Sequence, residues 1–125
     1  SQAAMALNRL GLGARPDDVP PADARRWALD QFERYEPMPA AWAGVPRTAA
    51  QVEGYEALLR TLRTTSDPPA ARQAYRRAGR DDYVLAVAAR ASSAVSTRAP
   101  FVARLVHFWA THFAVSVEKF YVLNF

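Results

Sequence analysis

The sequence predicts an all-α protein, built as a single domain of five to six helices. Apolar side chains recur every three or four residues in several segments, and this spacing places them on one side of a helix. Proline and glycine fall between these segments, where they begin or end helices. Strict alternation of apolar and polar residues, which would indicate strands, is almost absent.

Composition agrees with a folded domain. Half of the 125 residues are hydrophobic and 22% are charged, which argues against a disordered or collagen-like chain. No apolar run reaches the roughly 18 residues that a membrane-spanning helix needs. The chain has no cysteine, so disulfides, thiolate zinc sites and cysteine nucleophiles are excluded. No signal peptide is visible, and nothing else in the sequence indicates a compartment.

The first two helices are predicted over residues 2–10 and 21–35. Gly11 suits the left-handed position that ends a helix, because glycine adopts it without steric cost. Pro21 suits the first turn of the second helix, where the missing N–H is not needed. The proline-rich segment 37–47 is predicted to be a loop.

A third helix is predicted over residues 49–64. Thr48 and Gln51, three residues apart, have the form of a capping box at its start. Asp67 is expected to cap the helical region that follows.

That region extends to about residue 97, and Gly79 is expected to interrupt it. Two helices are therefore predicted, over about 69–78 and 81–97. Asp81 or Asp82 would cap the second of them.

The last helix is predicted over residues 101–115 and carries the widest apolar stripe in the chain. This stripe predicts a central helix whose aromatic side chains are buried. Its members are Phe101, Leu105, Phe108, Trp109, His112 and Phe113.

Four arginines form a cluster that could bind an anion. Like charges this close repel one another unless an anion lies among them, so a phosphate, an acidic protein surface or nucleic acid would fit. The alternative is a solvated helix face without a ligand. Residues 68–125 favour anions, since 8 basic and 3 acidic residues give them a net charge of +5. The cluster is Arg72, Arg76, Arg77 and Arg80.

The chain has only two histidines, His107 and His112. On a helix they point about 140° apart, so they cannot bind one metal as a pair, and neither a metal site nor a cofactor is predicted. His112 is expected to be either a core histidine or, together with Trp109, part of a ligand site. No pattern of nucleophile, base and acid is visible.

The chain ends on an aromatic, apolar stretch. Such a stretch has to be buried in the core, paired with another chain or left exposed. It therefore indicates a protein partner or self-association through Phe120, Tyr121, Leu123 and Phe125.

Two segments, ALNRLGLGARPDDV at 6–19 and RLVHFWATHFAVS at 104–116, resemble the uncharacterised bacterial family called domain of unknown function 1800. The resemblance implies members several times longer than this chain, of which these residues form the N-terminal portion. It also implies an acidic residue where Ala103 stands, and often an asparagine where Thr111 stands. The family has no established activity. The matching residues of the second segment are Phe108, Trp109, His112, Phe113, Val115 and Ser116.

The sequence therefore favours a helical interaction or structural module without a catalytic site of its own. Two alternatives stay open. One is a fragment of an enzyme or ligand-binding protein whose site is completed elsewhere, and the other is a polyanion-binding helical domain.

Overall fold

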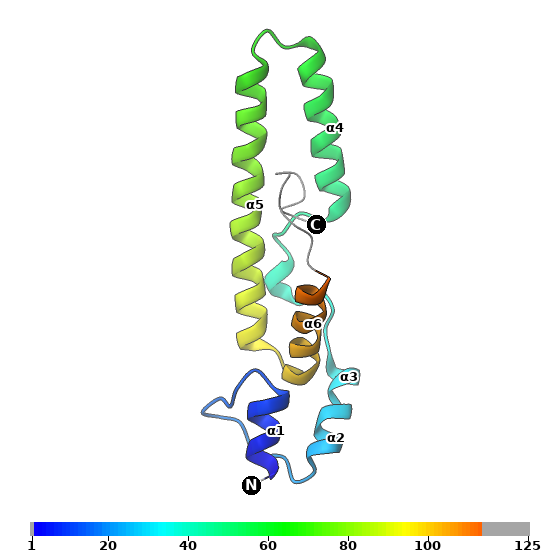
Figure 1. The fold of residues 1–125 in the computed structure, drawn as a ribbon, viewed down its shortest axis with the longest axis vertical. Helices are drawn as coiled ribbons and strands as arrows, with labels where there is room; N and C mark the ends of the chain where they lie inside the picture. The colour runs from blue at the N-terminus through cyan, green and yellow to red at the C-terminus, as the bar shows by residue number, and fades with distance from the viewer. Residues whose placement is uncertain (1, 114–125) are drawn as a thin grey trace. The chain divides into compact units, whose positions relative to one another are not determined.

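The computed structural model describes residues 2–113 (Figure 1). They form six α-helices and one short 3-10 helix, and no strand occurs among them, which confirms the all-α prediction. None of these helices is both long and apolar enough to span a membrane. The elements are α1 Gln2–Leu10, α2 Ala24–Leu29, α3 Gln31–Arg34, η1 Ala40–Trp42, α4 Thr48–Thr64, α5 Pro68–Ser96 and α6 Pro100–His112.

The described residues belong to two compact units. The first unit contains α1, α2, α3, the last residues of α5, and α6. The second unit contains η1, α4 and most of α5. The single-domain organisation expected from chain length stays a prediction.

In the first unit, α6 packs against other helices as predicted: it contacts both α1 and α3, and each of these also contacts α2. Pro100 stands in its first turn, where its ring fits the helical backbone. The rings of Phe32 and Phe101 meet edge to face, with centroids 5.9 Å apart. Small side chains allow this close helix packing, and the buried apolar residues of the unit are Ala6, Leu7, Ala28, Ala99, Val102 and Ala103.

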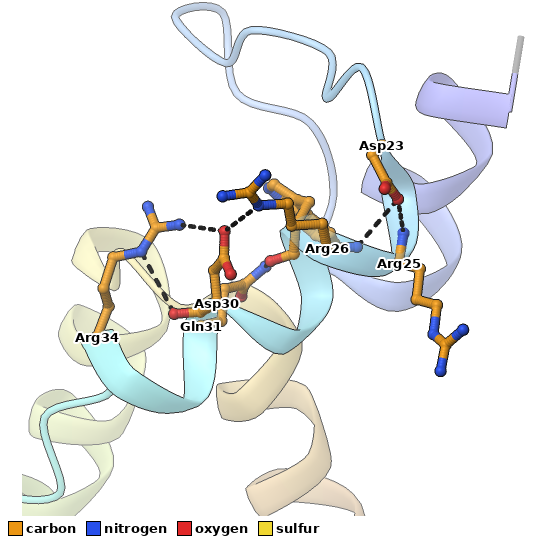
Figure 2. Close-up of polar contacts among 7 residues, drawn as sticks. Asp23, Arg25, Arg26, Asp30, Gln31 and Arg34 are labelled. Carbon is orange, nitrogen blue, oxygen red and sulfur yellow. Dashed lines mark hydrogen bonds and ion pairs between the residues drawn. The ribbon is translucent and has the colours of Figure 1, made fainter.

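The helix predicted over 21–35 is wrong in its start and its continuity. The Asp23 carboxylate accepts hydrogen bonds from the backbone N–H groups of Arg25 (2.9 Å) and Arg26 (3.0 Å), so α2 begins at Ala24 (Figure 2). The first N–H groups of a helix have no carbonyl partner within it, and the Asp23 carboxylate supplies an acceptor for two of them. Pro21, at the predicted start, has no side-chain acceptor. Asp30 separates α2 from α3, although its backbone stays right-handed helical.

Glycine after α1 does not act as expected. Among the described residues, only Gly13 has a positive φ, at 101°. Gly11 is buried at the end of α1, where its N–H donates to the Leu7 carbonyl oxygen (3.2 Å). A Cβ on Gly11 would lie 2.7 Å from that oxygen, so the position needs glycine for close approach and not for a left-handed backbone.

In the second unit, α4 and α5 run antiparallel as a helical hairpin (Figure 1). The Asp67 carboxylate accepts from the Ala70 N–H (3.0 Å), which confirms the predicted cap. The predicted interruption at Gly79 is wrong, because α5 is continuous and Asp81 and Asp82 lie inside it. One interior glycine costs only about 1 kcal/mol, which the good helix formers in the rest of α5 offset.

Two side-chain contacts join α4 to α5. The Gln51 amide donates to the Asp82 carboxylate (3.3 Å), and the rings of Tyr55 and Tyr75 lie 6.2 Å apart. The predicted capping box is wrong, since Thr48 is itself the first residue of α4 and Gln51 is used in this hairpin contact.

The hairpin is expected to lose stability at high pH through Tyr75. Its pKa is raised above the ordinary value of 10.0, chiefly because burial disfavours the phenolate, and Tyr55 and Asp82 add to the effect. The unfolded chain therefore releases this proton at a lower pH than the folded chain. The contribution is intact below the unfolded pKa and is lost as pH rises through the folded pKa.

We expect Tyr75→Phe to flatten the fall in the urea midpoint as the pH rises past 10.0, the ordinary pKa of tyrosine. Tyr83→Phe, an exposed position on the same helix, should keep the slope of the unsubstituted protein. An unchanged slope in Tyr75→Phe would contradict this assignment.

Candidate functional site

Gln31 makes the most deeply buried polar contact in the first unit. It is 1% exposed, and its side-chain oxygen accepts from the Phe101 N–H (2.7 Å). Its amide nitrogen donates to the Trp27 carbonyl (3.1 Å). Gln31 thus satisfies a free N–H at the start of α6 and joins α3 to that helix. Both ends of the amide are used, which indicates a structural role.

Two arginines hydrogen-bond to backbone carbonyls at helix C-termini, as Gln31 hydrogen-bonds to a backbone N–H at a helix N-terminus. Arg104 donates to the Gly11 carbonyl (2.8 Å) at the end of α1. Arg15 donates to the Thr97 carbonyl (2.9 Å) just after α5. Cations at these ends satisfy free carbonyls and interact favourably with the helix dipole. These contacts fix helix ends and leave no reactive group.

A second group of charges surrounds Asp30 on the exposed side of α2 and α3. Its carboxylate lies 3.8 Å from Arg26 and 3.9 Å from Arg34, in i,i+4 geometry (Figure 2). All three side chains are largely exposed, so each pair contributes little to stability. This arrangement needs no ligand to balance its charge.

The second half of α6 and its C-cap residue carry the aromatic cluster, which we define as Phe108, Trp109, His112 and Phe113. Phe108 stacks on His112, with centroids 5.9 Å apart and an interplanar angle of 15°. Trp109 stacks on Phe113 at 5.5 Å and 11°. Each pair is i,i+4, so neighbouring turns of the helix place the rings face to face.

The aromatic cluster is exposed, and the prediction that it is buried is wrong. Phe108, Trp109 and Phe113 are 58%, 47% and 71% exposed. The residues of α6 that reach the core are instead Val102 and Ala103, near its start. The stripe is longer than the part of α6 that α1 and α3 cover.

His112 is therefore not a core histidine. It is exposed, and its ring lies 5.8 Å from that of Trp109. Helix α6 contains no Asp or Glu, so no carboxylate of its own helix can orient the imidazole. Between residues 2 and 113, no group of three or more His, Asp or Glu is placed to hold a metal ion.

The arginine cluster separates into two rows on α5. Arg72, Arg76 and Arg80 follow one another at i,i+4 spacing, about 6 Å apart along the helix. Arg77 is turned about 100° from Arg76 and lies on the next row. All four are exposed, and none has an ion pair with the part of the chain that the structure describes. The predicted partner residues Phe120, Tyr121, Leu123 and Phe125 lie outside the described residues.

A family model described as "Protein of unknown function (DUF1800)" matches residues 5–124. The chain belongs to this family. The match covers nearly the whole chain and confirms the resemblance expected from the two segments. No curated protein and no solved structure is significantly similar to the chain. DUF1800 membership thus gives a family without a reaction.

The two segments that carry the resemblance to DUF1800 meet in the first unit. Arg104, which opens the second segment, donates to the carbonyls of Asn8 (3.4 Å) and Gly11 (2.8 Å) in the first. Ala103, where the family resemblance implies an acid, is buried. Sequence reasoning missed the roles of Gln31, Arg15 and Arg104. A signal for Gln31 existed, since it lies three residues after Ala28 on the buried side of its helices.

Proposed function

We propose that this DUF1800 chain is a helical interaction module that binds a protein surface through the aromatic cluster. The observation that carries the proposal is the exposure of Phe108 and Trp109 in α6 and of Phe113 at its C-cap, one turn further on. Soluble proteins rarely expose adjoining large apolar side chains unless they form a binding surface. Aromatic residues are also enriched in the centres of protein interfaces.

Ring stacking supports the same proposal. The pairs Phe108–His112 and Trp109–Phe113 hold the four rings in a fixed arrangement before any partner arrives. Less side-chain freedom is then lost on binding, so more of the contact energy contributes to affinity. The start of α6, packed on α1 and α3, gives the rings a rigid support.

The test uses the native protein in its own host, with a photo-crosslinking phenylalanine analogue at Phe113. Val19, which is 83% exposed, serves as the control position. We expect one recurrent crosslinked peptide from position 113 and none in common with position 19. Trp109→Ala should abolish that product, whereas Met38→Ala, at another exposed apolar residue, should leave it.

The stability of Trp109→Ala is the second readout. A half-exposed Trp should cost less than about 1 kcal/mol of unfolding free energy, against the 3–5 kcal/mol of a core aromatic residue. Crosslinks that are identical from positions 113 and 19 would reject the interaction role. A loss of several kcal/mol would assign Trp109 to the core.

Ligand binding at His112, with a site completed by residues outside this chain, is the second candidate. It is supported by the exposed imidazole beside the Trp109 ring, which could receive a planar or anionic group. Screening small aromatic acids by thermal shift tests it. A hit should vanish in His112→Ala and survive in His107→Ala, and hits that both variants retain would reject the site.

A further inference from the structure

Helix α5 carries two stripes at the spacing of helix–helix contacts. The first includes Tyr75 and Asp82, which contact α4. The second has successive spacings of 4, 4, 3 and 4 residues, the periodicity at which one helix face meets another. All members of the second stripe are exposed, and they are Arg72, Arg76, Arg80, Tyr83 and Val87.

The second stripe is turned about 100° from the first around the axis of α5. A helix that packs against two neighbours in a bundle has its two contact stripes separated by an angle of this size. Helix α4 occupies the first stripe through Tyr55 and Gln51. Within the described residues of the second unit, no helix occupies the second.

Helix α4 extends the same face of the hairpin. Val52 and Leu59 are seven residues apart, so they lie above one another on α4, and both are exposed. They are turned about 80° from the side of α4 that faces α5. The second stripe of α5 is rotated in the same sense from the side of α5 that faces α4. Because the two helices are antiparallel, equal senses of rotation place Val52, Leu59 and the second α5 stripe on the same side of the hairpin.

We propose that this side of the hairpin binds an acidic amphipathic helix of a protein partner. We call it the arginine–valine face, and it consists of Val52, Leu59, Arg72, Arg76, Arg80, Tyr83 and Val87. Carboxylates of the partner helix would pair with the arginine row, and its apolar residues would cover Leu59, Tyr83 and Val87. The proposal does not rest on the aromatic cluster, which belongs to the first unit.

Charge complementarity supports an acidic partner. Arg72, Arg76 and Arg80 present three like charges along about 12 Å of helix, with no carboxylate paired to them in the described chain. Guanidinium groups bind carboxylates through two parallel hydrogen bonds. An acidic helix facing the row would also relieve the repulsion between neighbouring arginines.

Apolar exposure distinguishes a protein helix from nucleic acid. Leu59, Tyr83 and Val87 are 41%, 45% and 49% exposed, and phosphates would leave the two aliphatic side chains uncovered. A partner helix with leucines on one side would cover these apolar side chains, and carboxylates beside its leucines would contact the arginines. Arg72 to Val87 spans about 22 Å, the length of a partner helix of roughly 15 residues.

The probe is a fluorescent synthetic peptide of about 18 residues with leucine on one helical face and glutamate and alanine elsewhere. A second peptide of identical composition has its leucines spread around the helix. The full chain should bind the first peptide at least about tenfold tighter than the second by anisotropy. Single-stranded oligonucleotide is the third probe.

Two matched pairs of variants locate the site. Leu59→Ser and Arg76→Glu should each weaken the amphipathic peptide about tenfold or more. Leu85→Ser, an exposed leucine on the opposite side of the hairpin, and Arg60→Glu, on the outer side of α4, should have less than about a twofold effect.

Equal affinity for the two peptides, or equal effects within either variant pair, would overturn the proposal. Tighter binding of oligonucleotide, weakened by Arg76→Glu and indifferent to Leu59→Ser, would instead assign the face to nucleic acid. Circular dichroism of each variant checks that the helices are intact. Neither result depends on Trp109 or Phe113, so the proposed function can fail or stand separately.

Discussion

Gln31→Leu should lower the free energy of unfolding of the first unit by about 2 kcal/mol. Leucine fills a similar volume but provides no acceptor for the Phe101 N–H, which the Gln31 oxygen holds at 2.7 Å. That N–H belongs to the first turn of α6, where no helical carbonyl can replace the lost partner. A buried donor without a partner costs about 1–3 kcal/mol, more than the net gain from an ordinary hydrogen bond.

Urea unfolding followed by circular dichroism measures this loss. Gln73→Leu is the matched control, because Gln73 lies exposed on α5 and should change stability by less than about 0.5 kcal/mol. If Gln31→Leu and Gln73→Leu unfold at the same urea concentration, the α3–α6 hydrogen bond is not a main source of stability.

Gly11→Ala should be similarly destabilising, by about 1–3 kcal/mol. The new Cβ would lie 2.7 Å from the Leu7 carbonyl oxygen, a backbone atom that cannot rotate away as a side chain does. The backbone would have to shift at the end of α1. That shift would also disturb the Gly11 carbonyl that Arg104 holds at 2.8 Å.

Gly54→Ala supplies the opposite result within the same protein. Gly54 lies inside α4, and a Cβ there meets nothing within 4 Å. Alanine should therefore raise stability by about 0.5–1 kcal/mol through its better helix propensity. Thermal unfolding of the two variants should give midpoint changes of opposite sign, and a neutral Gly11→Ala would show that the backbone accommodates the methyl group.

The helical class and the approximate positions of α1, α4 and α6 could be predicted from the sequence, because apolar periodicity and proline positions are local signals. Local signals failed where tertiary context decides. Gly79 does not interrupt α5, whose remaining residues favour the helix, and Asp23 starts α2 later than Pro21 suggested. The aromatic stripe on α6 is half-buried at Phe101 and Leu105 and exposed beyond them, since periodicity gives a direction and not the extent of the covering helices.

The polar contacts of the first unit could not be predicted from the sequence, for a different reason. Gln31 meets the backbone of Phe101 seventy positions along the chain, and Arg15 reaches Thr97. Periodicity and capping motifs are read within ten or fifteen residues, so they contain no information on contacts between residues this far apart in the sequence. The i,i+4 pair of Arg72 and Arg76 could be found from spacing alone, whereas Arg80 joins their row only because α5 is continuous across Gly79.

These long-range contacts also determine the order in which the protein can fold during synthesis. Residues 2–39 leave the ribosome before the hairpin, yet their partners in the first unit, residues 92–113, emerge only after the whole hairpin has been made. The α4–α5 hairpin closes a far shorter loop and can form while translation continues. Helices α1, α2 and α3 therefore keep Leu7 and Ala28 incompletely covered until α6 has been made, so they complete their native packing later than the hairpin that follows them in the sequence.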